Sequence, residues 1–182
     1  MANLNIKPAA SGDDLILKDG AGNNLVEIGN TNGTIIKNQA GTTIATINAS
    51  GMVMNDADLV APKIKDYSET VQANGTKTAA FDIDLSQGNV HTATIGSGTF
   101  NVGITNFNSS SNSSNSFTLV LTNGGAGTVS FVAGAHGGGG NAVQWAGGSA
   151  PTLTSNGVDI LVFFTPDSGT TFYGFSGGLN FS

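Results

Sequence analysis

The second half of the chain is a series of short segments in which apolar and polar residues alternate. Phe81, Ile83 and Leu85 alternate with two aspartates, and residues 117–122 follow the same rule. Such alternation places the apolar side chains on one face of a segment, as in a half-buried β-strand. Glycine and asparagine, which favour turns, separate the segments. The pattern predicts an all-β fold with about eight strands in this half.

The regular spacing of these segments indicates a β-sandwich, which we assign to the jelly-roll type. Val158–Thr165, with the sequence VDILVFFT, is apolar on both faces, so we expect a central strand covered on both sides. We expect Phe172 and Phe175 to fold back against that strand. Residues 108–116, NSSSNSSNS, predict a flexible polar loop. The expected strands occupy residues 81–85, 90–95, 100–104, 117–122, 129–131, 143–145, 158–165 and 171–175.

The N-terminal part contains a repeat, in which residues 16–28 align with residues 35–47 at a period of 19 residues. Each unit reads as strand, glycine-containing turn and strand, and Asn32–Gly33 is expected to turn between them. Stacked repeats need about three neighbours to bury a core, and the chain supplies only two hairpins. We therefore expect other copies to complete the core, as an intertwined homotrimer with a short β-shaft. The alternative is a pair of hairpins packed on the C-terminal domain.

The most charged stretch, residues 55–70, lies between these two parts and contains Pro62. We interpret it as a connector with a short helical turn at residues 56–59. The predicted organisation is an N-terminal β-repeat (residues 1–54) for attachment or a short stalk, a linker (55–77), and a C-terminal β-sandwich knob (78–182).

Charge is scarce and unevenly placed in this 182-residue chain. It has no arginine, its formal net charge is -6, and the charges beyond Asp84 are Asp159 and Asp167. Nucleic-acid binding needs clustered lysine or arginine, so we expect no nucleic-acid partner. No stretch approaches the roughly 20 apolar residues that span a bilayer, so we expect no membrane insertion. The N-terminal residues lack the apolar run of an export signal.

The histidines and glycines do not form a recognisable catalytic or cofactor motif. His91 and His136 are far apart in the sequence, and the chain has no cysteine, so we expect no metal site. Gly96–Gly98 reads as a turn, since it lacks the G-x-S-x-G pattern of a nucleophile elbow. Gly137–Gly140 lacks the lysine of a phosphate-binding loop. We therefore expect no catalytic residues and no cofactor.

Two acidic residues and a group of aromatic residues remain as candidates. Asp82 and Asp84 share one face of a strand, but two carboxylates are too few for Ca²⁺, which takes six to eight oxygens. We expect them to lie on a solvated face. The aromatic residues of the C-terminal segment could instead stack on sugars above a neutral rim, although such residues in a sandwich usually form core. Trp145 and Tyr173 are the candidates for surface contact with a glycan.

Ordered motifs in the C-terminal two thirds resemble a module of phage structural proteins. These are DIDLSQGNV, SFTLVLTNGG and VQWAGGSAPTLTSNGVDILVFFTPDSGTTFYGF, preceded by APKIKDYSETV. Their order is similar to that of a C-terminal module in structural proteins of marine tailed bacteriophages, chiefly cyanophages. The resemblance covers roughly residues 60–180.

The resemblance implies a non-enzymatic protein on the virion surface, and it brings no catalytic residues with it. The short shaft favours a capsid decoration or head fibre, attached to other virion proteins through the N-terminal region. The alternative is a tail fibre or receptor-binding module that recognises host surface glycans. A virion protein would be assembled in the host cytoplasm and released by lysis.

Overall fold

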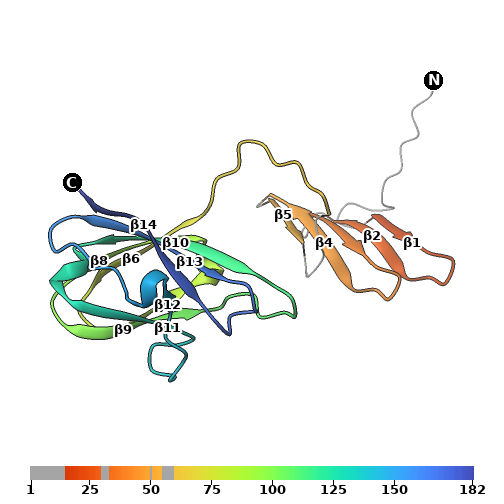
Figure 1. The fold of residues 1–182 in the computed structure, drawn as a ribbon. Coiled ribbons are helices and arrows are strands. Elements are labelled where there is room, and N and C mark those ends of the chain that lie inside the picture. The colour runs from red at the N-terminus through yellow and green to blue at the C-terminus, as the bar shows by residue number, and fades with distance from the viewer. Residues whose placement is uncertain (1–14, 30–32, 50, 55–59) are drawn as a thin grey trace. The chain divides into compact units, whose positions relative to one another are not determined.

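In a computed structural model of the chain, residues 15–29, 33–49, 51–54 and 60–182 are described. The fold is all-β as predicted, with 53% strand and 6% helix among the described residues. The chain divides into two compact units, Met1–Lys65 and Asp66–Ser182 (Figure 1). The expected attachment segment before residue 15, the turn at Asn32 and the helical turn at residues 56–59 lie outside the described residues.

The N-terminal unit is an antiparallel sheet in which each strand pairs with the next, in the order β1-β2-β3-β4-β5. Its strands are β1 (Leu15–Lys18), β2 (Asn24–Gly29), β3 (Gly33–Lys37), β4 (Thr43–Asn48) and β5 (Gly51–Met54). The β1–β2 and β3–β4 turns close with equivalent backbone hydrogen bonds. Asp19 N donates to Asn23 O over 3.0 Å, and Asn38 N donates to Thr42 O over 2.9 Å.

One face of this sheet, which we call the N-terminal apolar face, is almost entirely apolar. The strand register places two rows of side chains on it: Leu15, Ile28, Thr34, Ile47 and Met52, and next to them Leu17, Val26, Ile36, Ala45 and Met54. Among the described residues of this unit, Ala45 alone is buried, at 3% exposure. Ile28 and Met52 are 46% and 56% exposed. The described part of this unit therefore forms no core of its own.

The C-terminal unit contains a six-stranded sheet in the order β12-β14-β13-β10-β8-β6 and a three-stranded sheet in the order β11-β9-β7. The strands are β6 (Val71–Lys77), β7 (Phe81–Asp84), β8 (Val90–Ile95), β9 (Thr99–Thr105), β10 (Asn115–Thr122), β11 (Thr128–Ala133), β12 (Gln144–Trp145), β13 (Val158–Thr165) and β14 (Tyr173–Phe181). The described helices are three short 3₁₀ turns, η1 (Leu85–Gln87), η2 (Gly124–Ala126) and η3 (Ala146–Gly148), and none of them could span a membrane.

Strands β6 to β11 alternate between the two sheets as the chain advances. β6, β8 and β10 pair in parallel in one sheet, and β7, β9 and β11 pair in parallel in the other. These pairings differ from the antiparallel connections expected of a jelly roll. The physical reason is that each short connection carries the chain across to the opposite sheet instead of back beside the strand it left. We expected residues 71–77 to belong to the linker, but they form β6 at the edge of the six-stranded sheet.

Glycines allow successive crossings between the sheets to stack on one another. Gly96 N donates to Lys77 O, and Thr128 N donates to Gly98 O, both over 2.8 Å. A Cβ atom on Gly127 would lie only 2.8 Å from the carbonyl oxygens of Gly96 and Gly98. A larger residue would therefore push the crossings apart at this corner.

The core fills the space between the two sheets, and β13 lies at the centre of the larger one. β13 runs between β10 and β14, as expected of a central strand. Leu161 and Phe163 point into the core and are completely buried, whereas Phe164 on the other face is 38% exposed. The prediction that both faces are covered is therefore wrong. Phe172 is buried as predicted, but Phe175 is 46% exposed, so its expected inward packing is also wrong.

The asparagine- and serine-rich tract forms a loop between β9 and β10, and hydrogen bonds tie this loop down. Ser113 Oγ donates to Asn108 O over 2.6 Å. Ser168 Oγ donates to Ser110 O over 2.7 Å, which joins the loop to the turn after β13. Short polar side chains commonly bond to nearby backbone in this way. The tract thus makes specific contacts that its low complexity did not predict.

Candidate functional site

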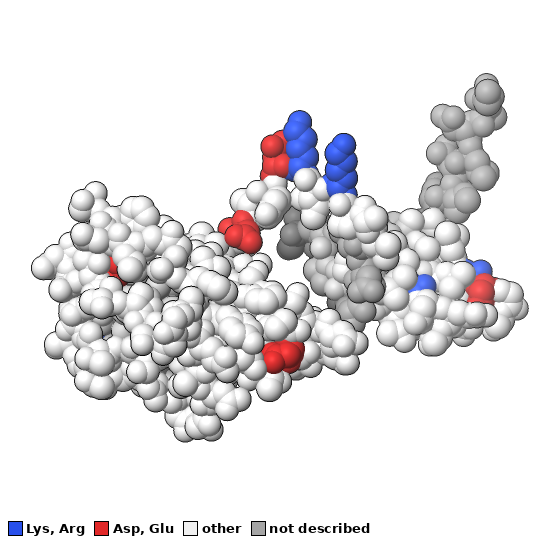
Figure 2. All heavy atoms as spheres, viewed as in Figure 1, with Lys and Arg blue, Asp and Glu red and all other residues white. Residues whose placement is uncertain are grey.

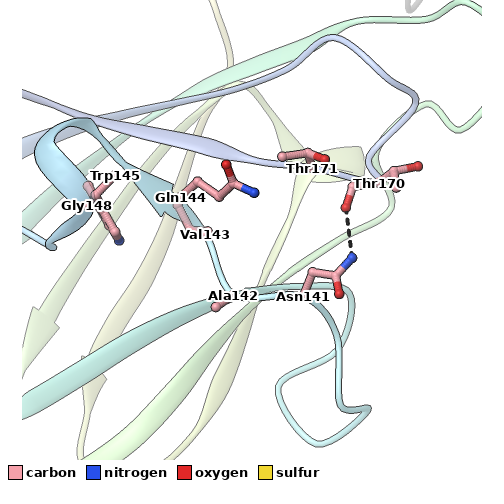
Figure 3. A pocket seen from close by; sticks show the side chains of 8 residues that line it. All are labelled: Asn141, Ala142, Val143, Gln144, Trp145, Gly148, Thr170 and Thr171. Carbon is pink, nitrogen blue, oxygen red and sulfur yellow. Dashed lines mark hydrogen bonds between the residues drawn. The ribbon is translucent and has the colours of Figure 1, made fainter.

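A polar groove in the C-terminal unit lies where β12 meets the start of β14 (Figure 3). Its volume is about 560 Å³. It is lined by Asn141, Ala142, Val143, Gln144, Trp145, Gly148, Thr170 and Thr171. None of these side chains is charged, and four of them carry amide or hydroxyl groups.

Backbone and side-chain hydrogen bonds fix both walls of the groove. Gln144 N donates to Phe172 O over 2.8 Å, which holds β12 against the segment that leads into β14. Asn141 Nδ2 donates to Thr170 O over 3.1 Å, as the dashed line in Figure 3 shows. Ala133 N donates to Asn141 O over 2.8 Å, so the loop before β12 is also tied to the end of β11. Hydrogen bonds therefore connect the loop before β12 to the end of β11 and to the segment that leads into β14.

Trp145, a predicted surface contact, belongs mainly to the core. Trp145 pairs with Gly174, and its ring packs over this glycine, because a Cβ atom on Gly174 would lie only 2.7 Å from the Trp145 ring. The ring packs edge-to-face against Phe131 and Phe163, with centroids 5.9 and 5.7 Å apart. Only the remaining, half-buried part of Trp145 lines the groove. Its principal role is to close the end of the core.

Tyr173, the second predicted contact, lies on the opposite face of the sheet from Trp145. Tyr173 pairs with Gln144 and Phe164 and is 38% exposed. Adjacent strand residues point to opposite faces, and Tyr173 directly precedes Gly174, over which Trp145 packs. The structure thus does not bring the two candidates together. Sequence patterns do not identify the groove's amide side chains, Asn141 and Gln144. Their only mark in the sequence is that two polar residues lie beside a short apolar segment.

His91 is a core residue. Its side chain is fully buried, with Nε2 2.9 Å from Gly88 O. Its ring packs edge-to-face on Phe117, with centroids 6.1 Å apart. Burial lowers the pKa of His91, because the charged imidazolium would lose its hydration. A neutral imidazole is therefore favoured at this position.

Asp82 and Asp84 are bound by separate sets of protein donors. Asp82 Oδ1 accepts from His136 N over 2.8 Å and lies 2.9 Å from His136 Nδ1. Asp84 Oδ1 accepts from Ser86 Oγ over 2.7 Å and from Asn106 Nδ2 over 2.8 Å, and these bonds lower the pKa of Asp84. Within the described part of the chain, no three His, Cys, Asp or Glu side chains gather as a metal site would require.

The two late carboxylates, Asp159 and Asp167, hold loops in place. Asp159 is completely buried, and it accepts hydrogen bonds from Thr154 N (2.7 Å), Thr154 Oγ1 (2.8 Å) and Asn180 N (3.0 Å). Asp167 accepts from Thr171 N over 2.9 Å, and this bond lowers the pKa of Asp167. Both carboxylates thus have protein donors as partners.

The chemistry of the groove suits a neutral ligand with hydroxyl or amide groups. Its amide and hydroxyl side chains can donate and accept hydrogen bonds, but they offer no charge to a phosphate or carboxylate. Comparisons with known protein families, with curated proteins and with solved structures find no match.

Proposed function

We propose that this chain is a non-enzymatic structural protein of a bacteriophage virion, exposed on the particle surface as a capsid decoration or head fibre. The N-terminal unit would join copies of the chain and attach to other virion proteins, and the C-terminal unit would project as a knob. The observation that carries this proposal is the uncovered N-terminal apolar face. The motif resemblance of residues 60–180 supplies the virion context.

A single sheet layer with an apolar face must cover that face with another layer. The N-terminal apolar face has one polar member, Thr34, while Leu17 and Ile47 are 48% and 43% exposed. The other face is mixed, since it carries the ion pair of Lys37 Nζ and Glu27 Oε1, 2.6 Å apart, together with the apolar residues Ile16, Ile35 and Val53. Exposed apolar patches of this kind mark interaction sites. The N-terminal apolar face is the more apolar of the two, and it is the face that we propose is covered.

Further copies of the same sheet are the simplest cover for this face. The equivalent turns at Asp19 and Asn38 support reading β1–β2 and β3–β4 as two repeated hairpins. Three chains would supply six such hairpins around a three-fold axis, with the N-terminal apolar faces turned inward. Closed cyclic symmetry is the usual arrangement of homo-oligomers. We therefore propose a homotrimer with a short β-shaft.

A structural role also agrees with the state of the acidic groups in the knob. Asp82, Asp84 and Asp159 each accept hydrogen bonds from two or more protein groups. A catalytic carboxylate must instead reach a substrate proton or a reacting atom. This arrangement supports the non-enzymatic proposal.

The molar mass in solution tests the proposal. At micromolar concentration, light scattering should give three times the chain mass of 18.2 kDa. Ile47→Lys on the N-terminal apolar face should reduce the mass to that of one chain, because it buries a charge in the interface. Thr46→Lys, one residue away on the opposite face, is the matched control and should keep the oligomer. A wild-type molar mass equal to that of one chain would contradict the proposal.

The proposed location on the virion surface needs a separate test. Imaging virions with and without the protein would show where its density lies.

The alternative is a tail fibre or receptor-binding module that recognises host surface glycans, and the uncharged polar groove favours it. Gln144→Ala should then reduce retention on intact host cells by about tenfold, since a lost hydrogen bond in a polar site costs about 1–2 kcal/mol. Gln87→Ala, at an exposed glutamine outside the groove, should leave retention unchanged. Equal retention of both variants would argue against glycan binding in the groove. Trp145→Ala is less suitable because Trp145 supports the core.

A further inference from the structure

The six-stranded sheet of the knob presents a second uncovered surface, formed by the outward side chains of β10, β13 and β14. We call it the outer knob face. The strand register arranges it in four rows: Ser116, Phe164 and Tyr173; Thr118, Val162 and Phe175; Val120, Ile160 and Gly178; Thr122, Val158 and Phe181. The opposite side chains of β10 and β13 point into the core, so these twelve residues form the solvent side of the sheet.

This face is apolar along β13 and β14 and uncharged in all four rows. Four aromatic side chains on it are between 38% and 49% exposed: Phe164, Tyr173, Phe175 and Phe181. Isolated exposed aromatic residues are ordinary, but four on adjacent strands make a contiguous patch of the kind that marks an interface. Aromatic enrichment with few charges is also typical of interface centres.

β14 has a bulge within the patch. The register shifts near Gly177 and Gly178, so neither residue places a side chain over β13. A Cβ atom on Gly177 would lie 3.3 Å from Ile160 Cγ2 and 3.4 Å from Val162 Cγ2. No side chain from Gly177 therefore covers the methyl groups of Ile160 and Val162, whereas the ring of Phe181 lies over Gly178.

We infer that the outer knob face contacts the knob of a second copy of this chain. A face without charge is matched best by another face without charge, because any charged group placed on it would lose its hydration without gaining a partner. The chain offers such a face in each copy. A charged residue, Glu69, borders this face in a small groove that it lines together with Ser116 and Thr118.

The inference rests on the proposed self-association of the N-terminal units. Copies joined through their N-terminal apolar faces would hold their knobs at an effective concentration of about millimolar, as short linkers do. A knob contact of modest intrinsic affinity would then be occupied in the assembled protein. Without that association the same contact would form only at high protein concentration. The two contacts can therefore be separated experimentally.

Thiol labelling of the full chain tests the inference, since the natural chain has no cysteine. Ser116→Cys places a thiol on the outer knob face beside Phe164, and Ser130→Cys places one on β11 of the other sheet. Both serines are exposed in the single chain, and the substitution is nearly isosteric. In the assembled protein a maleimide should modify Ser116→Cys at least about tenfold more slowly than Ser130→Cys. After dilution to single chains the two rates should converge.

Combining Ser116→Cys with Phe175→Ser should restore fast labelling while light scattering still reports the oligomer. Equal labelling of the two single-cysteine variants in an oligomer would overturn the inference and leave the N-terminal association standing. Protection of Ser116→Cys in single chains would also overturn it, because another part of the same chain would then cover the face. A mass of one chain at all concentrations would overturn the proposed self-association, and the inference with it.

Discussion

His91 shows how a single buried side chain links the stability of the knob to pH. Its ring packs edge-to-face on Phe117, and burial lowers its pKa more than the Gly88 hydrogen bond and the Asp84 carboxylate raise it. Because the pKa of His91 is lowered below 6.5 in the folded chain, the unfolded chain binds a proton first as the pH falls. The stabilising effect of neutral His91 is therefore complete above pH 6.5 and is lost as the pH falls through that value.

We expect the free energy of unfolding of the knob to decrease between pH 7.5 and 5.5, with a slope that reaches at most about 1.4 kcal/mol per pH unit for one proton. His91→Gln should flatten this slope, since glutamine does not titrate. Gln87→Ala, at an exposed residue that does not titrate, is the control and should retain the slope. Urea denaturation followed by Trp145 fluorescence measures the slope. An unchanged slope in His91→Gln would contradict the assignment.

The aromatic residues show what a sequence can and cannot predict at this scale. Trp145 and Tyr173 occupy neighbouring positions in the register of β12 and β14, but their side chains lie on opposite faces of the sheet. Which face each one occupies depends on the register of β12 against β14, and a two-residue strand carries no alternation from which to derive it. Phe175 was misplaced for a related reason, because its segment is apolar on both faces and only burial distinguishes them.

At the level of elements, alternation located the strands of the knob but not their partners. The segments predicted at 90–95, 117–122 and 158–165 correspond closely to β8, β10 and β13. Alternation fixes which side chains of a strand face the core, and it is the same for parallel and antiparallel neighbours. β6 was missed because VQANGTK is a polar edge strand with few apolar residues. The parallel pairing of β8 with β10 joins strands between which the chain crosses to the other sheet and back, and no local pattern encodes such a pairing.

The corner at Gly127 should be sensitive to a single methyl group. Gly127→Ala would bring Cβ within 2.8 Å of two carbonyl oxygens, so we expect the knob to lose about 1–3 kcal/mol of stability. Gly137→Ala is the matched control: no atom lies within 4 Å of its Cβ position, and its stability should change by less than about 1 kcal/mol. Urea denaturation monitored by Trp145 fluorescence compares them. Equal stability of both variants would show that the corner relaxes without cost.

At the level of the whole molecule, charge and apolar surface are separated. Figure 2 shows a C-terminal unit whose visible face is almost free of charged side chains. The N-terminal apolar face and the outer knob face are both uncharged, so the proposed contacts contain no ion pairs. Each chain nevertheless carries a formal net charge of -6, and assembled copies must bring these like charges together. Association should therefore be opposed by long-range repulsion and driven by apolar burial.

This balance predicts that salt strengthens the assembly. Raising sodium chloride from 10 to 150 mM shortens the Debye length from about 30 to about 8 Å, which screens repulsion between copies and leaves contacts between apolar side chains intact. We expect the dissociation constant, measured by sedimentation equilibrium at neutral pH, to fall by about tenfold, because several like charges a few nanometres apart repel by about 1–3 kcal/mol in water. Circular dichroism at each salt concentration would verify that the sheets stay folded. Interfaces held by ion pairs would respond in the opposite direction, so dissociation on adding salt would rule out the uncharged faces as the contacts between chains.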